Sequence, residues 1–257
     1  GSCNTLRKLA PKLAQVAAER VQQELHYLLT SPDTPWLYAA WEDQVLQVWL
    51  GKIPAQNVQQ IEQIEHSAWL LSKIWTDLGE QLHRPIGNDS TLLSLTKLAS
   101  LVSPDPNTAQ TQLETLKYSR LEIRTVTNLL EHLPRLLDIA DSPLSQEEQY
   151  FLFQNIGSHF PALAVLTVAV VAHQDTLRET RIVGLIAPLV NTYLDPQSQI
   201  AHPTPLLTGK DLIQQLALPP SPQIGQLLTK IQLARIAGTV TNREEALEYA
   251  RSQLNQQ

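Results

Sequence analysis

Apolar residues along the chain recur at intervals of three and four, which is the spacing of one face of an α-helix. The clearest stripe runs from about Thr5 to Leu29, where Pro11 is expected to break the helix into two pieces. Its apolar positions are Leu6, Leu9, Leu13, Val16, Ala17, Val21, Leu25 and Leu28. No clear strand pattern interrupts these helical stretches. The sequence therefore predicts an all-α fold with several helices and no substantial sheet.

One stretch is apolar on all sides: residues 161–172 read PALAVLTVAVVA. It is about half as long as the roughly 20 residues that a membrane-spanning helix needs. We therefore expect a buried core helix and no membrane partner. Five tryptophans fall between residues 36 and 75, and we expect these large rings to fill gaps between packed helices. They are Trp36, Trp41, Trp49, Trp69 and Trp75.

Several helix starts are marked by Ser or Thr followed three residues later by an acid. In such a capping box, the two residues satisfy each other's free backbone N–H groups. Four boxes and one Ser-Pro start occur: Ser119/Glu122, Ser145/Glu148, Thr208/Asp211, Thr241/Glu244 and Ser221-Pro222. Turn-rich stretches at 103–107, 140–143 and 195–205 separate the helices. The second is the best candidate for a domain boundary.

The chain carries a formal net charge of −6, which argues against a nucleic-acid binder that works through bulk positive charge. Only the two ends are basic: residues 1–30 carry +2 and residues 208–257 carry +1. If the chain binds an anionic polymer, local basic ridges must do so. The single cysteine, Cys3, excludes an internal disulfide, and no signal-peptide pattern opens the chain, so we expect a cytoplasmic protein.

Known catalytic patterns are missing from the sequence. It contains no G-x-x-x-x-G-K-[ST] phosphate loop, no G-x-G-x-x-G turn and no G-x-S-x-G nucleophile elbow. It also lacks the D-x-D pair that commonly supplies carboxylates for two-metal nucleotidyl transfer. We therefore predict no catalytic residue and no metal site within this chain.

Five short segments nevertheless resemble a known family. Residues 19–25 (ERVQQEL) are similar to its E-R-[IV]-x-x-E-L motif, and residues 116–123 (LKYSRLEI) to its L-K-[LY]-S-x-x-E-[IV] motif. Three further segments match its tail in order and spacing: 209–212 (GKDL), 221–228 (SPQIGQLL) and 238–247 (GTVTNREEAL). Ser221 stands where the family usually has Gly. These are motifs of the class II tRNA nucleotidyltransferase and poly(A) polymerase family, which includes CCA-, CC- and A-adding enzymes.

The resemblance implies a neck remnant at residues 1–35, a helical body at 36–140 and a helical tail at 141–257. Gly1 and Ser2 are typical of a residual cloning sequence. In this family a catalytic head with a G-S-x(3)-D-x-D core, and an E-D-x-x-R element that selects CTP or ATP, precede these parts. Neither is present here, so we expect the chain to position tRNA without adding nucleotides. Mg²⁺ and CTP or ATP would belong to the missing head of a CCA- or A-adding parent enzyme.

The neck and body motifs suggest roles for six residues. Arg20 and Glu24 are four apart on a helix and can pair, with Glu19 beside them, which would stiffen the neck. Basic residues of the body motif recur at three and four positions, so we expect a basic ridge along one helix face that binds RNA phosphates. The ridge consists of Lys117, Arg120 and Arg124. The alternatives are a surface ion pair in the neck and an ordinary solvated charged face in the body.

In the tail, two predicted helix starts would present backbone N–H groups to tRNA on its acceptor and TΨC side. Glycines there would allow a backbone to come close, and basic side chains would supply positive charge. The predicted RNA-binding residues of the tail are Thr208, Gly209, Lys210, Gly225, Lys230, Arg235 and Arg243. Capping boxes occur in any helical protein, so ordinary helix starts remain the alternative. For the whole chain, the alternative function is a helical protein-interaction scaffold with no role on nucleic acid.

Overall fold

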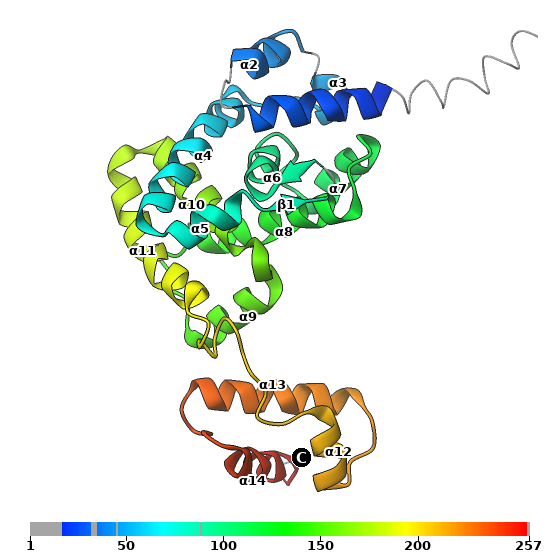
Figure 1. Cartoon of the computed structure of the whole chain (residues 1–257), viewed down its shortest axis with the longest axis vertical. Helices are drawn as coiled ribbons and strands as arrows, with labels where there is room; N and C mark the ends of the chain where they lie inside the picture. Colours follow the sequence, from blue (N-terminus) through cyan, green and yellow to red (C-terminus); the bar gives the residue numbers. More distant parts are fainter. Residues whose placement is uncertain (1–16, 32–34, 45, 88, 256–257) are drawn as a thin grey trace, which may run out of the picture. The chain divides into compact units, whose positions relative to one another are not determined.

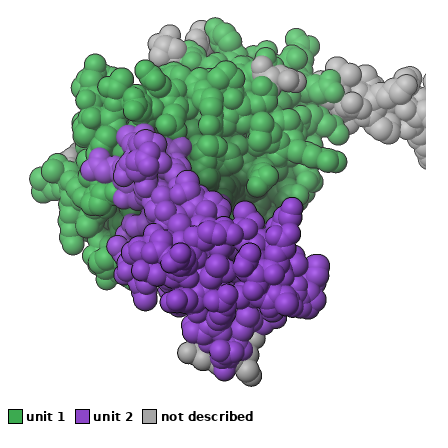
Figure 2. Space-filling view, turned by 60° about the horizontal axis from the view of Figure 1, so that its bottom comes forward, with its two compact units in different colours: residues 1–143, 155–190 green, residues 144–154, 191–257 purple. Residues whose placement is uncertain are grey.

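The computed structural model describes residues 17–31, 35–44, 46–87 and 89–255 (Figure 1). Gly1, Ser2, Cys3 and Pro11 lie outside this part. Contacts divide the chain into two compact units, coloured separately in Figure 2. Unit 1 comprises the described residues up to Pro143 together with Asn155–Val190, and unit 2 comprises Leu144–Gln154 and the described residues from Asn191 onward. The neck, body and tail boundaries at residues 35 and 140 follow motifs rather than contacts and stay a prediction.

Unit 1 is built almost wholly from helices. Its described part begins with helical residues 17–30. The elements that follow in unit 1 are α2 (Pro35–Glu42), α3 (Gln47–Leu50), α4 (Ala55–Ile74), α5 (Thr76–Leu82), β1 (Pro85–Ile86), β2 (Ser90–Thr91), α6 (Leu92–Ala99), α7 (Pro106–Thr115), α8 (Arg120–Leu137), η1 (Gly157–His159) and α10 (Phe160–Gln174). The two strands form an antiparallel hairpin in which Pro85 pairs with Thr91 and Ile86 with Ser90. The predicted all-α fold is confirmed, with this one small hairpin added.

Helix α10 forms the centre of unit 1. Every residue from Phe160 to Ala169 is buried, and the helix contacts α4, α5, α6 and α8. Gln146–Gln174 is long and apolar enough to cross a membrane, yet 67% of its most apolar window is buried inside the protein. Such burial is typical of the core helix of a globular protein. The core helix predicted for residues 161–172 is therefore confirmed.

A buried lysine fastens residues 17–30 to the rest of unit 1. On this helix Ala18, Leu25 and Leu29 are buried, whereas Ala17, expected in the apolar stripe, is exposed. Lys97 on α6 is only 2% exposed. Its ammonium donates to the Leu29 carbonyl at 3.0 Å and forms an ion pair with Glu65 on α4. One side chain thus joins three helices.

Most of the predicted helix starts are present. Reciprocal hydrogen bonds form at Ser119/Glu122, Ser145/Glu148 and Thr208/Asp211. The Thr241/Glu244 box is wrong by one residue, because Asn242 caps the helix and Glu245 reaches back to Thr241. Ser221 stands at a helix start with Pro222 next, but its side chain makes no capping bond.

The expectation that the tryptophans fill gaps between packed helices is wrong for Trp69, while Trp41, Trp49 and Trp75 are partly buried. None of the four whose side chains are described (Trp41, Trp49, Trp69 and Trp75) is fully buried. Trp69 is 57% exposed, with His66 stacked on it and the Lys73 ammonium 5.7 Å from its ring centroid. The indole N–H of Trp41 donates to the Ile53 carbonyl at 2.8 Å. Trp69 therefore lies on the surface, and Trp41 holds the loop that precedes α4.

Unit 2 is a small helical bundle with its own core. Its helices are α12 (Gly209–Leu216), α13 (Pro222–Ile236) and α14 (Arg243–Leu254), drawn in gold to red in Figure 1, and all three contact one another. The buried cluster between them includes Leu207, Leu212, Ile224, Leu227 and Ile231. The boundary between the units falls inside two further helices, α9 (Gln146–Ile156) and α11 (Thr176–Leu194).

Candidate nucleic-acid interface

The start of α8 is fixed by a buried carboxylate. Glu122 is 5% exposed and accepts hydrogen bonds from the Ser90 hydroxyl at 2.5 Å and the Ser119 N–H at 2.8 Å. Gly87 (φ +71°) allows the hairpin to approach, since a Cβ there would lie 3.2 Å from Glu122. The acid in this first turn therefore points inward, and the basic residues beside it keep their charge on the surface.

The predicted basic ridge is only partly a helix face. Arg120 and Arg124 are exposed and four apart on α8, as expected. Lys117 lies before the helix, so its predicted place on the same helix face is wrong. It is exposed and sits in the turn after α7 with φ +63°, a left-handed conformation usually taken by glycine. The N–H groups of Lys117 and Tyr118 close this turn on the carbonyls of Glu114 and Leu113.

Two segments distant in sequence join α8. Arg84, between α5 and β1, donates to the carbonyl and hydroxyl of Ser158 in η1 at 3.2 and 3.3 Å. Next to Ser158, His159 contacts α8: its Nε2 lies 3.2 Å from Thr125 Oγ1 and its Nδ1 lies 3.1 Å from Asn128 Nδ2. Sequence reasoning missed both, because the contacts join residues 31 to 74 positions apart.

His159 is held in its neutral form. Burial, together with the positive charges of Arg84 and Arg124, lowers the pKa of its imidazole. Since the Asn128 amide donates, Nδ1 must accept, which leaves the proton on Nε2. His159 therefore joins η1 to α8 through its two ring nitrogens and adds no charge at neutral pH. Arg84 and Arg124 lie close enough to His159 to affect its charge, and Lys117 and Arg120 lie just before and at the start of the same helix, α8. We call these four basic residues the body cluster.

In unit 2, two of the predicted RNA contacts already have structural partners. Arg243 forms a two-pronged ion pair with Asp211, with Nη2–Oδ1 at 2.9 Å and Nη1–Oδ2 at 3.2 Å. Thr208 caps α12 by accepting the backbone N–H of Asp211, and its own N–H donates to the same carboxylate at 2.8 Å. These bonds lower the pKa of Asp211, the Arg243 bond most strongly. The three residues together fasten the start of α14 to that of α12.

The other predicted RNA-binding residues of the tail differ in exposure and in the space around them. Gly209 is a packing glycine, because a Cβ there would lie 3.3 Å from Ile224 Cγ2 on α13. Gly225 has open space around it, and Lys210 and Lys230 are exposed. Arg235 donates to the carbonyl of Thr204. The close approach of Gly209 to α13 brings the first turns of α12 and α13 together.

The neck residues Glu19, Arg20 and Glu24 all lie on the exposed side of helical residues 17–30. Within the described part of the chain, Arg20 and Glu24 form no ion pair within 4.0 Å. The predicted Arg20–Glu24 pair is therefore not formed here. In the same described ranges, no group of three or more His, Cys, Asp or Glu side chains could hold a metal ion.

Comparisons with known proteins identify two family models in the chain. The model described as tRNA nucleotidyltransferase domain 2 matches residues 89–250, which include α8 and the whole of α12 and α13. The model described as "Probable RNA and SrmB-binding site of polymerase A" matches residues 2–58. No solved structure is a significant match to the chain.

Three known CC-adding or CCA-adding enzymes are similar in sequence to most of this chain. A CC-adding tRNA nucleotidyltransferase of Synechocystis sp. is 38% identical over 95% of this chain. A CC-adding tRNA nucleotidyltransferase of Geobacter sulfurreducens is 26% identical over 95% of it, and a CCA-adding enzyme of Leuconostoc mesenteroides is 24% identical over 97%. The chain spans 57%, 57% and 53% of their lengths. Since the first family model covers more than half of the chain, this protein belongs to the tRNA nucleotidyltransferase family.

Proposed function

We propose that this chain is the tRNA-holding part of a cytoplasmic nucleotidyltransferase that adds cytidine to tRNA 3′ ends. The observation that carries the proposal is the body cluster, where the fold brings Arg84 close to the basic start of α8 on a protein of net charge −6. The similarities to CC-adding and CCA-adding relatives support the reaction class. They favour cytidine addition over the A-adding parent among our sequence expectations.

The body cluster suits phosphate recognition. Guanidinium groups bind phosphate oxygens through two parallel hydrogen bonds, and Lys117 adds a point charge beside them. Contacts of this kind hold RNA without reading its bases, as a protein that serves many tRNAs requires. Glu122 is turned inward and His159 is neutral, and among the described residues none of the cluster's arginines has an ion pair within 4.0 Å.

We propose that the tail contributes through Lys210, Gly225 and Lys230. All three are exposed. Lys210 and Gly225 lie in the converging first turns of α12 and α13, whose positive dipole ends favour phosphate, and Lys230 lies further along α13. The acceptor and TΨC side of tRNA would lie here. Thr208, Gly209, Arg235 and Arg243 would act indirectly, by holding the loops and helix starts in place.

Chemistry would come from elsewhere in the parent enzyme. The chain spans a little over half of its relatives' length, and a catalytic head with Mg²⁺ and CTP or ATP would belong to the rest. Incubating the chain with tRNA and radiolabelled CTP and ATP should therefore give no incorporation. Label appearing in tRNA after careful purification would contradict this part of the proposal.

Binding of labelled tRNA at a series of salt concentrations tests the holding role. We expect log Kobs to fall linearly with log [salt], with each phosphate contact contributing about 0.7–0.9 to the slope. Arg120→Gln and Arg124→Gln should each weaken binding and flatten the slope by about that amount. Arg251→Gln on α14 is the control, since it removes an equally exposed arginine outside the proposed contacts. Equal effects of all three substitutions would refute the body cluster as the site.

One observation favours the alternative scaffold function. Trp69, Ile74 and Leu177 are large apolar side chains of unit 1 that are 57%, 51% and 85% exposed. Exposed apolar side chains mark protein interfaces where they form a contiguous patch. If tRNA does not bind even at low salt, the scaffold becomes the better explanation, and Trp69→Ala would be the first variant to examine.

A further inference from the structure

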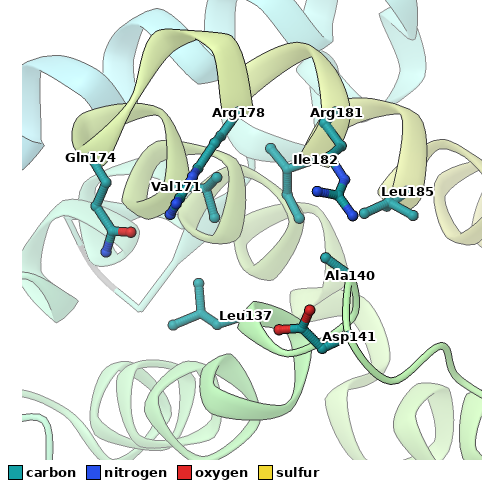
Figure 3. Close-up of a pocket in the computed structure, with 9 residues that line it drawn as sticks. All are labelled: Leu137, Ala140, Asp141, Val171, Gln174, Arg178, Arg181, Ile182 and Leu185. Carbon is teal, nitrogen blue, oxygen red and sulfur yellow. The ribbon is translucent and has the colours of Figure 1, made fainter.

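A cavity of about 290 Å³ lies in unit 1, apart from the body cluster. It is formed by the C-terminal end of α8 and the residues after it, the end of α10, and the first turns of α11 (Figure 3). Its apolar wall consists of Leu137, Val171, Ile182 and Leu185. This volume is near the lower end of the range for small-molecule sites, so only a small ligand fits.

Two arginines face this cavity. Arg178 and Arg181 are three apart on α11, and Figure 3 shows both side chains extending from that helix toward the end of α8. Helical residues three apart lie on the same side of the helix, so both guanidiniums border the same cavity. Gln174 lies on the Arg178 side, and Asp141 lies across from Arg181 (Figure 3).

The charged side chains that line the cavity, Arg178, Arg181 and Asp141, form no ion pair with one another. Arg178 has its nearest carboxylate, Asp175, at 3.8 Å. Among the described residues, neither Arg181 nor Asp141 has an ion pair within 4.0 Å or a side-chain hydrogen bond. The guanidinium of Arg181 and the carboxylate of Asp141 therefore remain available beside the apolar wall, while Arg178 shares its charge with Asp175 through a long ion pair.

We propose that this cavity binds a single nucleotide. Its phosphate would be held by Arg178 and Arg181, since planar guanidiniums match phosphate geometry. Its base would lie on the apolar wall formed by Leu137 and Ile182, and Asp141 would accept hydrogen bonds from a sugar hydroxyl or base amino group. A bare phosphate would leave that wall and Asp141 unused. The nucleotide is either a free nucleoside 5′-monophosphate or an unpaired nucleotide of bound RNA.

Calorimetric titration of the chain with AMP, CMP and inorganic phosphate at low salt tests the proposal. Arg178→Gln and Arg181→Gln should each weaken nucleotide binding at least tenfold. Ala140→Leu should abolish it without changing charge, because Ala140 lines the cavity and a larger side chain would fill it. Arg251→Gln on α14 is the matched control, and the Tm of each variant reports whether it still folds. If Ala140→Leu does not fold, the exposed arginine variants still carry the test.

The outcomes separate the two sources. Binding of free AMP or CMP that depends on both arginines supports a free nucleotide. If free nucleotides do not bind, but Arg178→Gln and Ala140→Leu weaken tRNA binding while Arg251→Gln does not, the nucleotide belongs to RNA. Equal affinity for phosphate and nucleotides, or no effect of the cavity variants on either ligand, would overturn the proposal. Loss of tRNA binding through Arg120→Gln and Arg124→Gln is a separate result, which concerns only the body cluster.

Discussion

Replacing Lys97 by methionine should loosen residues 17–30 from the rest of unit 1. Met keeps most of the length and apolar volume of the lysine stem, so the packing of α6 changes little. The substitution removes the hydrogen bond to the Leu29 carbonyl and the ion pair with Glu65. A charge-assisted hydrogen bond of this kind contributes about 1.5–3 kcal/mol. The Glu65 side chain is 39% exposed and can be hydrated, so we expect a loss of about 2 kcal/mol in the free energy of unfolding.

Removing the other partner should cost more. In Glu65→Ala the Lys97 ammonium, whose side chain is 3% exposed, keeps its charge without a carboxylate. Leaving a buried charge uncompensated costs about 3–5 kcal/mol. The double variant should therefore be more stable than Glu65→Ala alone. Glu80→Ala, which removes an exposed carboxylate from α5, is the control and should change little.

Urea unfolding followed by circular dichroism gives these free energies, and hydrogen exchange locates the effect. In Lys97→Met, the amides of residues 17–30 should exchange faster than those of α10. The reasoning is refuted if Glu65→Ala costs less than Lys97→Met, or if exchange of residues 17–30 is unchanged in both variants.

Three further results are expected. Lys117→Gly relieves the left-handed backbone and should raise the unfolding free energy by about 0.5–1 kcal/mol while weakening tRNA binding; a fall in both would contradict the strain argument. Asp211 has a lowered pKa in the folded state, so its contribution to stability is present above its unfolded value of about 3.9 and is lost as the pH falls further; acid unfolding monitored by circular dichroism should be less steep in Asp211→Asn. Gly209→Val should destabilise unit 2 by about 1–3 kcal/mol through overlap with Ile224, whereas Gly225→Ala, in open space, should not destabilise it; thermal unfolding distinguishes them.

Local features of the fold could be predicted from sequence. The cap at Ser119 and the fully apolar run that becomes α10 are properties of a few neighbouring residues, and both were predicted correctly. The error at Thr241 is also local. Asn242 is an equally good cap and accepts the N–H of Glu245, and the acid that reaches back to Thr241 is Glu245 rather than Glu244. Periodicity cannot choose between two adjacent caps of similar strength.

Long-range features could not be predicted. Nothing near Arg84 or His159 in the sequence indicates that they meet beside Arg124, because the chain between them must fold first. The burial of Lys97 could not be predicted for the same reason, because its partners are Glu65 and Leu29, the second of which lies 68 residues away in the sequence. Lys117 was assigned to the helix because its spacing fits, but the turn after α7 takes it out of register.

The way the chain passes between its two units restricts how the protein can be divided. It leaves unit 1 after Pro143, just before α9, returns within α9 and leaves again within α11, so no single cut separates the units. A chain truncated after residue 190 would keep Tyr150, Leu152 and Phe153, which are buried in the intact protein, but would lose Tyr193, which stacks on Phe153. Such a truncation would expose an apolar surface and invite aggregation, whereas α12 to α14, with a core of their own, can be removed with far less disturbance.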